Sequence, residues 1–145
     1  MNIDKTDRLL LKLLAQDSRL SIKSLSEQVG LSAPATADRV RRLEENQIIE
    51  GFSITINLQA LGYPLMAIVR VKPLAGQLHY VQKLIQQMPE CTECDKVTGE
   101  DCFVMRLQVR SMQHLDEILD PIADYAQCNT SLVKTTPVKQ RLPPI

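Results

Sequence analysis

Three arginines within four positions form the group of side chains in this sequence best suited to bind an anion. Arg39, Arg41 and Arg42 follow a Gly30-Leu31-Ser32 turn, and a guanidinium pairs with phosphate oxygens or, in bidentate fashion, with a guanine edge. At about 100° per residue, the segment after Ser32 turns its polar and small residues away from its apolar face. That outer face carries Pro34, Ala35, Asp38, Arg41 and Arg42, with Arg39 at its border. The alternative is an amphipathic helix whose arginines are merely solvated.

Small residues at the start of this helix would let it approach base edges closely. The segment therefore predicts a recognition helix for DNA, with Ser32, Pro34, Ala35, Thr36, Asp38, Arg39, Arg41 and Arg42 as candidate contacts. Asp38 is unfavourable beside phosphate, so it either accepts a hydrogen bond from a cytosine amino group or orients an arginine.

Four cysteines are the other reactive side chains. Cys91 and Cys94 have the spacing of a zinc or thioredoxin-like pair, with Cys102 and Cys128 as further thiols. However, Cys91 and Cys94 fall in a predicted strand three positions apart, which places them on opposite faces. Neither histidine has ligand spacing to them, so the sequence favours free thiols and no metal site.

Local capping signals show which elements position the arginines. Ser21 can cap a helix from Ile22, and Gly30 stands where a left-handed residue would end it. Ser32 can cap the next helix, in which Pro34 is tolerated because the first turn has no intrahelical N–H bond to lose. This order of elements is that of a helix-turn-helix.

The flanking segments complete the first predicted domain, residues 1–57. Asp4 can cap an additional first helix, with Asp7 in its first turn. Phe52, Ile54 and Ile56 alternate with polar residues, which predicts a wing strand or connector leaving the helices. Residues 58–64 are then a linker.

The sequence from 65 to 145 follows a different pattern. We expect strands at 65–71, 92–97, 102–109 and 130–135, and helices at 77–88 and from a Ser111 cap to about 122. The order βαββαβ is the ferredoxin-like unit, so the predicted fold class is α+β, a winged helix-turn-helix followed by this domain. Both helices would cover one face of the sheet, and a second copy of the chain is the simplest cover for the other face.

Composition narrows the function only slightly. The net charge is zero, with 8 basic and 8 acidic residues before Asn57 and 9 of each after it, so no bulk charge favours nucleic acid. The N-terminus is too charged for a signal peptide and no apolar run approaches membrane-spanning length, which predicts a cytoplasmic protein without membrane partners. No nucleophile with a partner base and no phosphate loop occurs. We therefore expect neither an enzyme nor a bound cofactor.

Taken in order, the motifs resemble the leucine-responsive/asparagine-regulator (Lrp/AsnC) family of bacterial and archaeal transcription regulators over nearly the whole chain. They are Ile3-Asp4-x-x-Asp7, Asp17-Ser18-Arg19-Leu20-Ser21, Val29-Gly30-Leu31-Ser32, Arg39-Val40-x-Arg42-Leu43-Glu44, Ile48-Ile49-x-Gly51-Phe52, Leu58-x-x-Leu61-Gly62 and Val97-Thr98-Gly99. The resemblance implies DNA-binding dimers that associate into tetramers or octamers. It also implies that an amino-acid effector binds between dimers near the Val97-Thr98-Gly99 turn.

That turn has suitable chemistry for an amino acid. Gly99 would expose backbone N–H groups to a carboxylate, and Glu100 or Asp101 would pair with an ammonium. The candidate effector residues are Thr98, Gly99, Glu100, Asp101, Cys102 and, on the last strand, Thr130. The family's commoner pattern has aspartate three positions after the glycine, where this chain has Cys102, and a one-residue shift turns a strand side chain to the other face. A plain hairpin turn with solvated acids is the alternative.

The predicted function is sequence-specific transcription regulation through double-stranded DNA, modulated by a small amino acid. Alternatives are a thiol-, redox- or metal-responsive DNA-binding regulator and, from another class, a ferredoxin-like small-molecule-binding module or enzyme.

Overall fold

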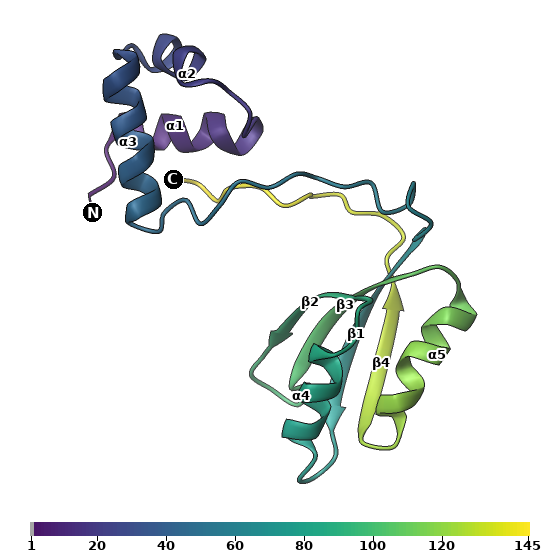
Figure 1. Ribbon diagram of the computed structural model, residues 1–145. Coiled ribbons are helices and arrows are strands. Elements are labelled where there is room, and N and C mark those ends of the chain that lie inside the picture. The colour runs from purple at the N-terminus through teal and green to yellow at the C-terminus, as the bar shows by residue number, and fades with distance from the viewer. Residues whose placement is uncertain (1) are drawn as a thin grey trace. The chain divides into compact units, whose positions relative to one another are not determined.

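The computed structural model describes residues 2–145, which form two compact units (Figure 1). The helical unit comprises the chain up to Thr55 together with Pro137–Ile145, and the sheet unit comprises Ile56–Thr136. Pro137–Ile145, predicted from the sequence to belong to the second domain, are grouped by their contacts with the helical unit.

The helical unit contains α1 (Lys5–Gln16), α2 (Ile22–Val29) and α3 (Ala33–Glu45). Each helix begins at its predicted cap: Asp4 and Asp7 form a reciprocal capping box on α1, while Ser21 and Ser32 accept from Ser24 and Ala35 amides. Gly30 ends α2 with φ 71°. The core beneath these helices consists of Leu10, Leu14, Leu25, Val40 and Leu43.

Of the two alternatives predicted for residues 52–56, a wing strand or a connector, the structure has the connector. Residues 51–57 run without strand structure, because no other segment among residues 2–145 pairs with them. The apolar side chains that suggested a strand are largely in solvent, with Phe52 50%, Ile54 78% and Ile56 53% exposed.

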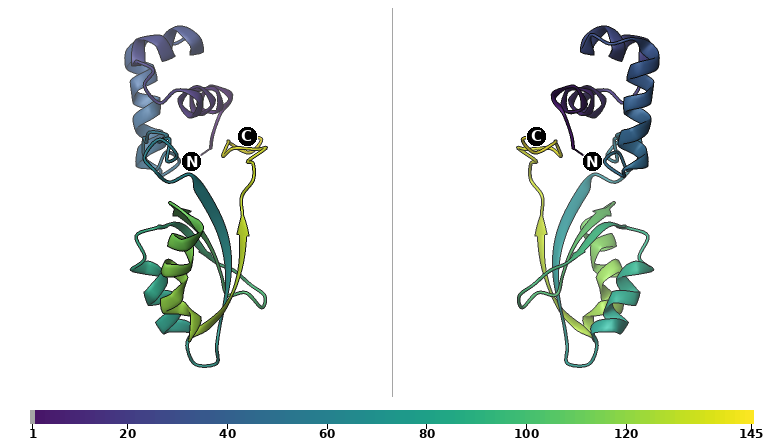
Figure 2. Two further views of the ribbon diagram at one scale, coloured as in Figure 1. Left: turned by 90° about the vertical axis from the view of Figure 1, so that its right-hand side faces the viewer. Right: turned by 90° about the vertical axis from the view of Figure 1, so that its left-hand side faces the viewer.

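The sheet unit has the predicted ferredoxin-like order. Its elements are β1 (Leu65–Pro73), α4 (Leu78–Gln86), β2 (Cys91–Lys96), β3 (Phe103–Val109), α5 (Met112–Ala123) and β4 (Ala126–Leu132). The strands pair antiparallel in the order β2-β3-β1-β4, and both helices lie on one face (Figure 2).

Alternation along the central strands separates the two faces of the sheet. Ala67, Val69 and Val71 of β1, with Phe103, Met105, Leu107 and Val109 of β3, are buried toward the helices. On the open face, Met66, Ile68 and Val104 are half-buried beside the exposed Arg70 and Arg106.

The last strand begins at Ala126 rather than at the predicted residue 130, and ends at Leu132. All of its residues after Ala126 are exposed, so it lacks the apolar alternation by which strands are recognised. Pairing with β1 alone defines it, from Pro73 opposite Ala126 to Ala67 opposite Leu132.

Candidate nucleic-acid interface and effector turn

The first turn of α3 presents a small, exposed surface. Ser32 Oγ accepts from the Ala35 amide at 3.3 Å, and Ser32, Pro34 and Ala35 are exposed. Pro34 stands in the first turn, where its missing N–H leaves no hydrogen bond unmade. No long side chain therefore blocks the approach of another molecule to this end of the helix.

Thr36 does not belong to that surface. It is fully buried, and its hydroxyl donates to the Ser32 carbonyl at 3.0 Å. The prediction that it lies at the interface is corrected: a position one residue after Ala35 on the helix turns the side chain into the core.

Arg39 is held by the N-terminus of α1. One guanidinium nitrogen, Nη1, donates to Asp4 Oδ2 at 2.7 Å and to Asp7 Oδ1 at 2.8 Å, and the Asp7 side chain is only 3% exposed. Hydrogen bonds from the Asp7 amide and from Arg39 lower the pKa of the Asp4 carboxyl. The charge of Arg39 is thus neutralised within the protein, and this side chain joins α1 to α3.

The other two arginines differ in their partners. Arg41 pairs with Asp38 one turn earlier and lies 3.6 Å from Glu45 Oε1. Of the two roles predicted for Asp38, the structure therefore has the one in which it orients an arginine. Arg42 is exposed, and among residues 2–145 no carboxylate lies within ion-pair distance of it. Arg42 is therefore the α3 arginine whose charge is available to an external anion.

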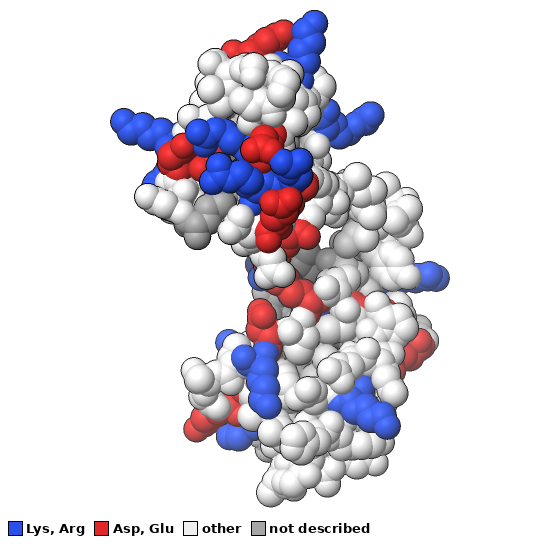
Figure 3. All heavy atoms as spheres, turned by 60° about the vertical axis from the view of Figure 1, so that its left-hand side comes forward, with Lys and Arg blue, Asp and Glu red and all other residues white. Residues whose placement is uncertain are grey.

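Basic and acidic side chains are mixed over the helical unit on the side that Figure 3 displays, in agreement with the 8 basic and 8 acidic residues before Asn57. Attraction of a polyanion here therefore depends on the position of a few exposed cations, Arg42 among them, and not on a large basic surface.

In the sheet unit, the turn between β2 and β3 places its two acids against basic residues of β1. Glu100 lies 3.2 Å from Lys72 Nζ, and Asp101 lies 3.9 Å from Arg70 Nε. Arg70 also donates to Asn129 Oδ1 at 3.3 Å. These residues form a charged cluster, Arg70, Lys72, Glu100, Asp101 and Asn129, on the open face of the sheet.

The turn itself leaves backbone donors available. Gly99 adopts φ 113°, and the Val97 amide donates to the Cys102 carbonyl at 2.9 Å to close the hairpin. Within the described part of the chain, the amides of Thr98, Gly99 and Glu100 donate no hydrogen bond. Three adjacent N–H groups can donate to a carboxylate, and the acidic side chains next to them can accept from an ammonium.

Thr130 does not join this cluster within one chain. It pairs opposite Val69 on the helix-covered face, whereas its neighbour Asn129 pairs opposite Arg70 on the open face. Arg70 and Lys72 were missed because the sequence analysis treated β1 only as an apolar strand. Their alternation with Val69 and Val71 was the signal that they share an exposed face.

The cysteine prediction needs a correction. All four cysteines are free thiols as expected, but Cys91 and Cys94 do not point to opposite faces. A bulge shifts the register of β2, so that Cys91 pairs opposite Leu107 and Cys94 opposite Met105, both on the helix-covered face. Partial burial raises the pKa of the Cys91 thiol, and burial, with Cys91 and Asp95 nearby, raises that of Cys94 to about 11.

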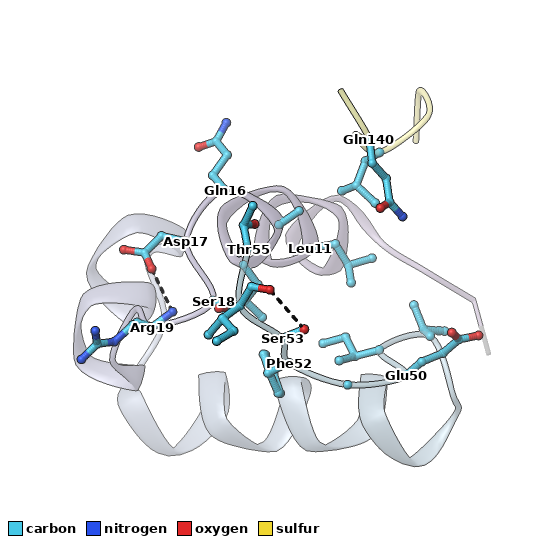
Figure 4. A pocket seen from close by; sticks show the side chains of 17 residues that line it. Leu11, Gln16, Asp17, Ser18, Arg19, Glu50, Phe52, Ser53, Thr55 and Gln140 are labelled. Atoms are coloured by element: carbon cyan, nitrogen blue, oxygen red, sulfur yellow. Dashed lines mark hydrogen bonds between the residues drawn. The ribbon is translucent and has the colours of Figure 1, made fainter. Parts of the chain in front are cut away.

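A hollow of about 730 Å³ in the helical unit lies along the C-terminal end of α1 and the segment 48–55 (Figure 4). None of the predicted site residues lines it. Phe52 and Thr55 contribute to its wall, and the Arg19 amide donates to Asp17 Oδ1 at 2.9 Å beside it. It is an open trough beside the unpaired segment and gathers no catalytic group.

Comparison with known proteins identifies both units. A family profile described as winged helix-turn-helix DNA-binding matches residues 3–50, and one described as Lrp/AsnC ligand binding domain matches residues 66–143. The transcriptional regulator LrpA of Mycobacterium tuberculosis is 34% identical over 129 residues, 88% of this chain and 86% of its own length.

Solved structures agree over nearly the full length. Bacillus subtilis LrpC superposes with a TM-score of 0.90 at 26% identity, covering 97% of this chain and 100% of its own. A feast or famine regulatory protein from M. tuberculosis, complexed with L-methionine, gives a TM-score of 0.89 at 30% identity, covering 98% and 99%.

Proposed function

Because the chain belongs to the Lrp/AsnC family of DNA-binding transcription regulators and is not an enzyme, we propose that α3 enters the major groove of double-stranded DNA. The observation that carries the proposal is the exposed Ser32–Ala35 end of α3 with the unpaired Arg42 on the same helix. Ser32, Pro34 and Ala35 approach base edges, and Arg42 contacts a phosphate, while Asp38 orients Arg41 on the same helix. Arg39 instead fixes α3 to the N-terminus of α1 through its ion pairs with Asp4 and Asp7.

The salt dependence of DNA binding tests this assignment. Each phosphate contact contributes about one unit to the slope of log K against log salt, so Arg42→Ala should flatten the slope by about one. Lys12→Ala, which removes an exposed cation from α1, is the matched control and should leave the slope unchanged. An unchanged slope in the Arg42→Ala protein would remove Arg42 from the interface.

We further propose that a small amino acid is the effector and that it binds at the β2–β3 turn. The amides of Thr98, Gly99 and Glu100 receive its carboxylate, while Asp101, beside Arg70, receives its ammonium, with the Cys102 backbone closing the turn. In support, a relative of the same fold has been solved with L-methionine. Thr130 takes part only if a second chain brings its strand to the turn.

A thermal-shift screen of the twenty amino acids identifies the effector, because a ligand at 100 times its Kd adds about 2.7 kcal/mol to stability. Asp101→Asn should abolish the shift, and Asp95→Asn, an exposed acid of β2 outside every ion pair in residues 2–145, should retain it. The absence of a shift with all twenty would reject an amino-acid effector.

Self-association follows from the surfaces that one chain leaves open. The exposed Phe52, Ile54 and Ile56 and the apolar residues of the open sheet face suit a second copy of the chain. We propose a homodimer that associates further into a tetramer or octamer, which fixes the spacing of two α3 helices on DNA. None of the helices in residues 2–145 is long and apolar enough to span a membrane. Since its target is chromosomal DNA, we place the regulator in the cytoplasm.

A further inference from the structure

An irregularity in β2 brings two thiols together on the face of the sheet that α4 covers. Thr92 is the extra residue of the bulge, and its hydroxyl donates to the Arg106 carbonyl at 3.3 Å. Cys91 and Cys94 consequently pair with residues two apart on β3, Leu107 and Met105. Their side chains therefore emerge on the same face of the sheet.

The two thiols border one hollow of about 330 Å³ between β2 and α4. Gln82, Ile85 and Gln86 of α4 and Lys96 and Phe103 of the sheet complete its lining, with Thr92 and Glu93 at the bulge. Lys96 pairs opposite Phe103, so it shares the face of the thiols, and its ammonium lies 6.0 Å from that ring. Lys96 therefore lines the same hollow as the two thiols.

The number of donors restricts what this hollow can hold. Among residues 2–145, no group of three or more His, Cys, Asp or Glu side chains is placed to hold a metal ion. Zinc in proteins requires a four-coordinate set, which two thiols do not supply. Thiolate ligands favour Cu(I), zinc and iron–sulfur clusters, and of these Cu(I), a soft monovalent cation, is satisfied by two donors.

We propose that Cys91 and Cys94 bind one Cu(I) ion in two-coordinate geometry. Each thiol releases its proton to solvent, two Cu–S bonds form, and copper and sulfur keep their oxidation states. Two thiolates and one monovalent cation carry a net charge of −1, and Lys96 is the cation among the residues that line the hollow.

Competition for Cu(I) under nitrogen tests the site in the reduced full-length protein. Titration against the chromophoric chelator bicinchoninate should show one Cu(I) withdrawn per chain. Cys91→Ser and Cys94→Ser should each lose this ability, while Cys102→Ser, the matched control, should retain it. Lys96→Met should weaken binding about tenfold, the lower end of the usual effect of residues supporting a metal site.

A second measurement avoids reliance on variants that fail to fold. At a pH high enough for both thiols to react in the copper-free protein, loading with one Cu(I) should protect Cys91 and Cys94, but not Cys102, from alkylation by iodoacetamide, as read by peptide mass spectrometry. Failure of the parent protein to take Cu(I) from the chelator would overturn the proposal. Equal binding by the parent and both serine variants, or protection without respect to position, would also overturn it. The amino-acid effector proposal stands or falls separately, since its residues are on the other face of the sheet.

Discussion

Replacing Arg39 by methionine should destabilise the helical unit while leaving the exposed face of α3 unchanged. In the native protein, Arg39 Nη1 lies 2.8 Å from Asp7 Oδ1, and the Asp7 side chain is 3% exposed. Methionine preserves the length of the side chain and much of its packing, but removes the cation that compensates this carboxylate. The Asp4 amide, which donates to Asp7 Oδ2 at 3.2 Å, is the remaining hydrogen-bond donor.

The magnitude follows from the burial of the pair. Removing one partner of a buried ion pair costs about 3–5 kcal/mol, because the other charge is left uncompensated. The Arg39 side chain is 28% exposed, so water can screen part of the loss and we expect the lower end, about 3 kcal/mol. At about 4–8 °C per kcal/mol for a domain of this size, the melting temperature of the helical unit should fall by more than about 10 °C.

Amide hydrogen exchange in the full-length protein measures this loss locally, with the amides of β3 as an internal reference. Arg42→Met is the control, since it removes an exposed arginine without an ion-pair partner in residues 2–145 and should stay within about 0.5 kcal/mol. Adding Asp7→Leu to Arg39→Met should restore part of the protection by removing the orphaned carboxylate. Protection of α1 and α3 within about 0.5 kcal/mol of the parent would refute the role of Arg39 as a structural ion pair.

Three further outcomes are expected. The pKa of Asp4 is lowered from 3.8, so its contribution to stability is present above that pH and is lost as the pH falls through the lower folded-state value. Acid titration followed by circular dichroism should show this loss of stability, and the Asp4→Asn protein should lack this pH dependence. Ile54→Lys places a charge on the most exposed of the apolar residues of segment 52–56 and should shift the protein toward the monomer in light scattering, whereas an unchanged mass would exclude this segment from the dimer contact. Because the pKa of Cys94 is raised to about 11, its alkylation by iodoacetamide should be slow near neutrality and accelerate up to about that pH; a plateau below pH 9 would contradict the burial of this thiol.

Much of the fold was predictable because its signals are local. The capping box of Asp4 and Asp7 and the serine caps involve groups within three residues of each other, so the sequence alone places them. The central strands β1 and β3 alternate because one side faces the helices. By contrast, the start of β4 was misplaced, since an edge strand with exposed side chains on both faces has no apolar period to detect.

The candidate sites were only partly predictable for the same reason. The sequence shows three arginines on one helix. It does not show that Arg39 pairs with a residue before α1, whereas Arg41 pairs within its own helix. It also marks the acids after Gly99, yet their basic partners, Arg70 and Lys72, come from a strand nearly thirty positions earlier. Charge type is a property of the residue, whereas its neutralisation depends on what the fold brings beside it.

The sequence by itself therefore determined the two-part organisation, the helix-turn-helix with its caps and the βαββαβ order, because these depend on contacts between near neighbours and on simple periodicity. Only the tertiary structure decided that Arg39 joins α1 to α3 and that Arg42 is left unpaired within residues 2–145. It alone decided that a bulge at Thr92 turns Cys91 and Cys94 to one face. Each of these depends on pairing between segments distant in the chain, which no local pattern encodes.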